Sequence, residues 1–246
     1  MAADQDPPPA YAASERYGPR VHRSVRHGAV LLVVGTVQFI VAMAITQVGY
    51  GSSYSLTGNY MSDLGAVNCG TFGGTASYAG HYACSPWHDV FNISIVIMGL
   101  LVILATILIR TAFPVRRSRT IGLWALALAG LGSVGVGLSP EDVNIAVHSG
   151  SAVLAFAGGG IALVVLAFAM LRDTRWEGFR AYTFFSGLIT LIALILFVSK
   201  VDLGLGVGGM ERLVVAPVFL WSIVAGIHLA RIPTFAPRLF SKPSAE

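Results

Sequence analysis

Four side chains in this sequence combine the residue types that bind a catalytic metal ion. His88 and Asp89 are adjacent, and Asp142 stands six residues before His148. Two imidazoles with one or two carboxylates can hold zinc and leave one coordination position open for water, as metallohydrolases require. We therefore take His88, Asp89, Asp142 and His148 as a candidate metal site, with zinc as the candidate ion.

Two other interpretations of these residues remain open. The sequence has no His-x-x-x-His pair and no Cys-x-x-Cys pair, so these ligands would meet only through folding. Acidic residues in the first turn of a helix complement its dipole, which would give Asp89, Glu141 and Asp142 a capping role. The histidines and acids could also act as a metal-free acid and base.

A serine beside an acid, Ser62-Asp63, adds a candidate nucleophile. The simpler interpretation is a local turn or a helix cap, since both residue types favour such positions. The candidate catalytic residues are therefore His88, Asp89, His148, Ser62 and Asp63, and none of them is assigned a definite role.

The candidate ligand-binding residues are polar groups that lie inside apolar stretches or flank them. Asn92 falls within the hydrocarbon by our count, where an amide should point into the protein and find a partner. Lys200 and Arg212 could pair with nearby acids, hold a lipid phosphate, or extend to the membrane interface. The full set is Asn92, Glu141, Asp142, Lys200 and Arg212.

Composition identifies the elements that must position these residues. Charged residues are 11% of the chain and apolar residues 55%, with a mean hydropathy of +0.72. Each apolar stretch is long enough to cross a bilayer, and lipid offers no partners to exposed backbone groups, so the spans should be helices. We predict an all-α bundle of six transmembrane helices at 29–48, 90–110, 120–138, 148–171, 179–199 and 212–230.

Small residues predict that the third and fourth spans form a tight hairpin. They recur every four residues and let helices approach closely where hydrophobicity gives no drive between them. The stripes are Ala125, Ala129, Ser133 and Gly137 on the third span and Ser151, Ala155 and Gly159 on the fourth.

Positive charge predicts the orientation. Fourteen of the sixteen lysines and arginines fall in the two tails and in the second and fourth connections. Such segments stay in the cytoplasm during insertion. We expect a multi-pass plasma (inner) membrane protein with a disordered cytoplasmic tail at 1–28, a membrane domain at 29–230 with a long outer loop at about 49–87, and a cytoplasmic tail at 231–246.

The net charge of +4 is explained by these cytoplasmic arginines, which favour anionic lipid headgroups over nucleic acid. The two cysteines, Cys69 and Cys84, both fall in the expected outer loop, where thiols tend to oxidise. A disulfide there is expected to stabilise the fold by roughly 3 kcal/mol. Two unpaired thiols remain the alternative.

Polar residues other than arginine gather at the outer ends of the spans, which favours an outward-facing cleft. The first functional hypothesis is a non-enzymatic protein that binds a lipid, a small apolar ligand or a partner subunit there. The second is a metal-dependent hydrolase that acts on lipid at the outer leaflet. Membrane lipids, a helix-to-helix partner and a second copy of the chain are the expected partners. Transport is the least supported hypothesis.

Short motifs across residues 29–230 resemble the bacterial and archaeal membrane proteins of the domain of unknown function 998 family. They are Tyr54-Ser55, Asn59, Ser62-Asp63-Leu64-Gly65, His88-Asp89, Phe91-Asn92, Gly137, Pro140-Glu141-Asp142 and His148. The resemblance implies a six-helix membrane fold and no established reaction. A looser similarity to ceramidases and progestin-receptor-like proteins implies serine, aspartate and histidine around zinc, although their paired histidines on a late span are missing here.

Overall fold

The computed structural model describes residues 20–50, 54–72 and 81–231. The structure is mostly α-helical, and six helices are long and apolar enough to cross a membrane. They are α2 (Arg20–Tyr50), α3 (His88–Ile109), α4 (Arg117–Leu138), α5 (Ile145–Ala169), α6 (Phe179–Val198) and α7 (Gly206–Arg231). The six predicted spans are confirmed.

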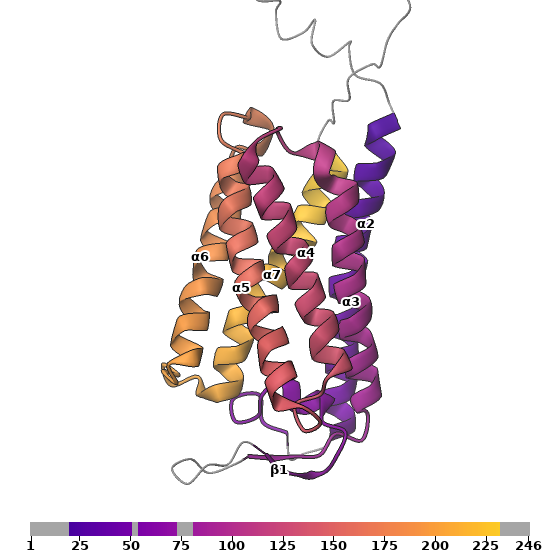
Figure 1. Ribbon diagram of the computed structural model, residues 1–246, viewed down its shortest axis with the longest axis vertical. Helices are drawn as coiled ribbons and strands as arrows, with labels where there is room; N and C mark the ends of the chain where they lie inside the picture. The colour runs from indigo at the N-terminus through magenta and orange to yellow at the C-terminus, as the bar shows by residue number, and fades with distance from the viewer. Residues whose placement is uncertain (1–19, 51–53, 73–80, 232–246) are drawn as a thin grey trace, which may run out of the picture.

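The helices form a closed bundle of antiparallel neighbours (Figure 1). Each helix packs against the next in the chain, and α7 returns to pack against α2. α2 begins and α7 ends at the same end of the bundle, which we call the arginine end. The opposite end, where the α2–α3 and α4–α5 connections lie, is called the loop end. Apolar side chains such as Val34, Ile93 and Leu100 are exposed on the outside of the bundle, as a lipid-facing surface requires.

The first helix begins earlier than the sequence predicted. The expected disordered tail at 1–28 is helical from Arg20 onward, which adds about two and a half turns at 3.6 residues per turn, and arginine is a favourable residue in a helix. The remainder of that tail, and nearly all of the expected tail at 231–246, lies outside the described residues.

Helices α4 and α5 make the most extensive contact in the bundle, as the small-residue stripes predict. A Cβ atom added at Gly132 would lie 2.5 Å from the backbone nitrogen of Ala155, and one at Gly158 would lie 3.1 Å from the carbonyl oxygen of Ala125. Two members of the predicted stripes face other helices. Gly137 packs on the backbone of α3, and Gly159 faces α7.

The α2–α3 connection is folded against the loop end. It contains a short 3₁₀ turn, η1 (Ser62–Gly65), and two antiparallel strands, β1 (Gly70–Phe72) and β2 (His81–Ala83), with Thr71 opposite Tyr82. A disulfide joins Cys69 to Cys84 and closes the base of this hairpin. The strands were not predicted, because three residues on each side are too few for an alternating pattern to be recognised.

Candidate functional site

The turn η1 carries Ser62 and Asp63 into the protein interior. All four of its residues are buried, and the backbone N–H of Ala66 donates to the carbonyl of Asp63 at its end. Gly65 lies so close to α3 that an added Cβ would be 2.5 Å from Oδ1 of Asn92. Asn92 in turn donates its amide hydrogen to the carbonyl of Gly65 at 2.9 Å. This contact fixes η1 on the end of α3.

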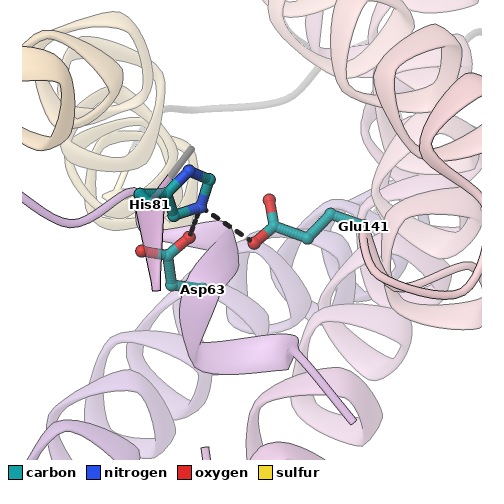
Figure 2. Close-up of side chains that lie close together, drawn as sticks. All are labelled: Asp63, His81 and Glu141. Atoms are coloured by element: carbon teal, nitrogen blue, oxygen red, sulfur yellow. Dashed lines mark hydrogen bonds and ion pairs between the residues drawn. The ribbon is translucent and has the colours of Figure 1, made fainter. Parts of the chain in front are cut away.

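Three ionisable side chains converge beside this turn. Asp63 comes from η1, His81 from strand β2 and Glu141 from the α4–α5 connection (Figure 2). The Nε2 atom of His81 lies 2.8 Å from Oδ1 of Asp63 and 3.7 Å from Oε1 of Glu141. One ligand atom from each of the three residues lies within 4.8 Å of the others. We call Asp63, His81 and Glu141 the acid–imidazole cluster.

The second oxygen of each carboxylate is held by a separate donor. Asn59 donates its side-chain amide to Oδ2 of Asp63 at 2.8 Å, and the Ser62 hydroxyl donates to Oε2 of Glu141 at 2.7 Å. Oε1 of Glu141 is buried and has no hydrogen-bond partner among the described residues, and Nδ1 of His81 is in the same state. The carboxylates are therefore oriented, with one oxygen of each directed at His81.

These surroundings shift the pKa values of two members. Hydrogen bonds to Asp63 and Glu141 raise the pKa of His81 to about 10, although partial burial opposes them. Burial raises the pKa of Glu141, and the adjacent Asp63 carboxylate adds to the rise, while His81 opposes it. The imidazolium form of His81 is thus favoured whenever no other cation occupies the cluster.

A third carboxylate, Glu211 on α7, lies next to η1 and lines the pocket. Glu211 is 6% exposed, and its Oε2 accepts a short hydrogen bond from the backbone N–H of Met61. The neighbouring Arg212 contacts an earlier part of the α2–α3 connection. Its guanidinium donates to the carbonyls of Leu56, Asn59 and Gly208 and to the Tyr54 hydroxyl.

A pocket leads from this region into the bundle. Ser62, Glu211 and His148 line its polar end, and the rest of its wall is mostly apolar. The wall reaches Val102 on α3, Leu126 on α4 and Ser222 on α7. The cavity volume of the pocket is about 70 Å³. The pocket is therefore long and narrow.

The model of the family described as "Protein of unknown function (DUF998)" matches residues 33–228, which include every residue of the cluster and the pocket. The chain belongs to this family. The resemblance drawn from the motifs is thereby confirmed. Searches of the curated proteins and of the solved structures gave no significant match.

In this DUF998 protein, the four predicted metal ligands do not meet as one group: His88 lies 3.5 Å from the adjacent Asp89, while Asp142 and His148 have other partners. Nδ1 of His88 is 2.8 Å from the carbonyl of Ser85, and the Asp89 side chain is exposed. Asp142 accepts hydrogen bonds from the backbone N–H groups of Val67 and Asn68, which ties the α2–α3 connection to the α4–α5 connection.

His148 is buried, with Nδ1 3.0 Å from the carbonyl of Ser139, and it lines the pocket. Among the described residues, the group of His and acidic side chains that meets closely enough to share an ion is Asp63, His81 and Glu141.

The remaining predicted residues divide between the pocket region and the surface. Ser62, Asp63 and Glu141 belong to the site, and Asn92 supports it through Gly65. Lys200 is exposed just after α6. Sequence reasoning missed His81 and the pocket-facing position of Glu211. The signal for His81 was its place between Cys69 and Cys84, because a disulfide there would keep it near Ser62 and Asp63.

Proposed function

We propose that this membrane protein binds a single-chain amphiphile, with the alkyl chain in the interior pocket and the polar head group beside the acid–imidazole cluster. The observation that carries the proposal is the pocket itself, which is mostly apolar along its length and has the ionisable groups of Glu211 and His148 at one end. Such a division matches the two parts of an amphiphile.

The dimensions of the pocket support a slender ligand. Its wall runs from Phe91 to Val102 on α3 and from Glu211 to Ser222 on α7. Each path is roughly 16 Å long, since a helix rises about 1.5 Å per residue. That is close to half of a hydrocarbon core about 30 Å thick. The narrow free space favours one alkyl chain over a ring system, and Met61 and Met98 in the wall can adapt to it.

The charge pattern supports an outward-facing head-group site. We infer that the arginine end, with Arg23, Arg110 and Arg117, lies in the cytoplasm and that the loop end faces outward. The disulfide at the loop end agrees with an oxidising compartment. In this orientation, in the plasma membrane, the protein takes its ligand from the outer leaflet.

A photoreactive lipid tests the proposal. Detergent-purified protein is incubated with a lysophosphatidylcholine that carries a diazirine near the end of its chain, irradiated and digested. Crosslinks are expected on the pocket-lining parts of α3 and α7. Crosslinks confined to outward-facing positions such as Leu100 and Leu220, which are exposed, would contradict it.

A matched pair of variants sharpens the test. Ala152→Phe places a ring in the pocket wall, whereas Val153→Phe places the same ring on the exposed side of α5. Ala152→Phe is expected to lower pocket crosslinking roughly tenfold, the change that about 1.4 kcal/mol of lost affinity produces. Val153→Phe is expected to leave it unchanged. Equal crosslinking in the two variants would contradict an interior site.

A lipid hydrolase is the second candidate, and one contact favours it. The Ser62 hydroxyl lines the pocket and donates to Glu141, within the cluster that also contains Asp63 and His81. A hydroxyl and an acid–base pair at the mouth of an alkyl-chain pocket could act on an ester bond there. Release of fatty acid from the same lysophospholipid, lost in Ser62→Ala and retained in His88→Gln, would support hydrolysis. A wild-type protein that releases none would leave binding as the function.

A further inference from the structure

We propose that Asp63, His81 and Glu141 form a binding site for a divalent transition-metal ion, with zinc as the best-fitting ion. The site differs from the four ligands that the sequence suggested, and it does not depend on whether the pocket binds lipid. Three features of the cluster carry the inference: its geometry, the support of its ligand atoms and its charge.

The geometry fits a small ion. Oδ1 of Asp63, Oε1 of Glu141 and Nε2 of His81 come from three separate segments and point toward one another (Figure 2). Ligand atoms bonded tetrahedrally to zinc lie roughly 3.4 Å apart, because each bond is about 2.0–2.1 Å long. The two distances from Nε2, 2.8 and 3.7 Å, lie on either side of this spacing. Small side-chain rotations would therefore complete the coordination.

Each of the two carboxylates accepts a hydrogen bond from a neighbouring side chain, as metal ligands usually do. Outer-shell hydrogen bonds orient the ligands of a metal and are needed for full affinity. Here the Asn59 amide holds the distal oxygen of Asp63, and the Ser62 hydroxyl holds the distal oxygen of Glu141. Each carboxylate is thus left with one oxygen directed at the centre of the cluster.

The charge balance favours a divalent cation, because in its absence a single imidazolium at His81 faces two carboxylates. Asp63 is fully buried, and Glu141 is 8% exposed with Oε1 lacking a hydrogen-bond partner among the described residues. Glu211 adds another buried acid through its contact with Met61, while the Arg212 guanidinium is directed at backbone carbonyls. Buried acids need a partner or an ion. A divalent cation would neutralise Asp63 and Glu141 together.

The ligand set selects the class of metal. Calcium and magnesium prefer oxygen ligands alone, whereas an imidazole nitrogen favours zinc and the other first-row transition metals. Three protein ligands leave a fourth position open for water or for an oxygen of a bound head group. The ion would lie beside Ser62, at the polar end of the pocket.

Metal titration of purified protein tests the site. The full-length protein is stripped with chelator and titrated with ZnCl₂ by calorimetry, without added lipid, and Co²⁺ absorption serves as an independent readout. About one equivalent of zinc is expected to bind, and the thermal midpoint should rise with zinc. Glu141→Gln and His81→Gln should weaken binding by roughly 100-fold or more, and Ser62→Ala by roughly 10- to 100-fold.

His88→Gln is the matched control, because His88 contacts only Ser85 and Asp89 in the described residues and should bind zinc like the wild type. Wild-type protein that binds neither Zn²⁺ nor Co²⁺ would overturn the site. So would affinity that is unchanged in Glu141→Gln, or that falls in His88→Gln and not in His81→Gln. Should His81→Gln fail to fold, the near-isosteric Glu141→Gln and the wild-type Co²⁺ spectrum still decide. Lipid crosslinking in chelator-treated protein is measured separately, so failure of one proposal is distinguishable from failure of the other.

Discussion

At the scale of single residues, His81 is the member of the cluster that lies close to both carboxylates. Its Nε2 lies 2.8 Å from Asp63, a buried residue of η1, and 3.7 Å from Glu141 of the α4–α5 connection. In chelator-treated protein its raised pKa favours the protonated form in the folded state. The contribution of His81 to stability is therefore present below its ordinary pKa of 6.5 and is lost as the pH rises through about 10.

This pKa shift predicts how stability depends on pH. Between pH 6.5 and pH 10, the thermal midpoint of chelator-treated wild type should fall relative to that of His81→Gln, whose side chain does not titrate. Thermal unfolding in one detergent across this range, followed by tryptophan fluorescence, measures the difference. A parallel pH profile in the two proteins would mean that His81 is not protonated in the folded state.

Part of the site could be predicted from the sequence, namely the residues whose type and position near the end of a span already suggest a role. Ser62, Asp63, Glu141 and Asp142 were identified because acids and hydroxyls near span ends are expected to be functional or structural. His81 was not, because it lies eighteen positions after Asp63 in the sequence and is brought back to it by the β1–β2 pairing. The candidate metal set that included His88 and His148 would form only if folding brought its members together, whereas each ring lies within hydrogen-bond distance of a carbonyl of its own connection.

At the scale of elements, glycine allows the helices of the bundle to touch through their backbones. A Cβ at Gly132 would lie 2.6 Å from the carbonyl oxygen of Ser151, and backbone atoms of α5 cannot move aside as a side chain can. Gly150 lies in the same helix as Ser151, but a Cβ added there would have no atom within 4 Å. Both glycines are therefore helical, but Gly132 of α4 is tightly packed and Gly150 of α5 is not.

Alanine substitutions should separate these roles. Gly132→Ala is expected to destabilise the protein by about 1–3 kcal/mol through overpacking. Gly150→Ala should stabilise it by about 0.5–1 kcal/mol, because alanine favours the helix. Thermal midpoints in the same detergent provide the comparison. Stabilisation of both variants would show that α4 and α5 are farther apart than the structure has them.

Helix centres were predicted well and helix ends less well, for a physical reason. Hydropathy defines the part of a helix that crosses the hydrocarbon, but the ends are set by contacts that a single sequence does not reveal. α7 begins at Gly206, earlier than the predicted 212, although the glycines at 206, 208 and 209 are unfavourable in a helix. Gly206 has a φ of +70°, and a Cβ at Gly208 would collide with the carbonyl of Asn59, so these glycines pack the helix against the α2–α3 connection.

At the scale of the whole molecule, the separation of arginine from acid and imidazole along the bundle axis determines where the site would act. Single cysteines at the two ends test the inferred orientation. Val143→Cys lies in the α4–α5 connection beside the cluster, and Val115→Cys lies in the α3–α4 connection among Arg110, Arg116 and Arg117. Both native valines are exposed, and Cys69 and Cys84 are already joined, so the new thiols should be the reactive ones.

An impermeant maleimide applied to intact cells should label Val143→Cys, and it should label Val115→Cys only after the membrane is opened. The reason is that arginine-rich connections are retained in the cytoplasm during insertion, which leaves the loop end outside. Labelling is read by mass shift on a gel, with the unsubstituted protein as the control for residual thiol reactivity. If Val115→Cys reacts in intact cells and Val143→Cys does not, the cluster faces the cytoplasm. The proposed ligand would then have to come from the inner leaflet, and a metal ion from the cytosolic pool.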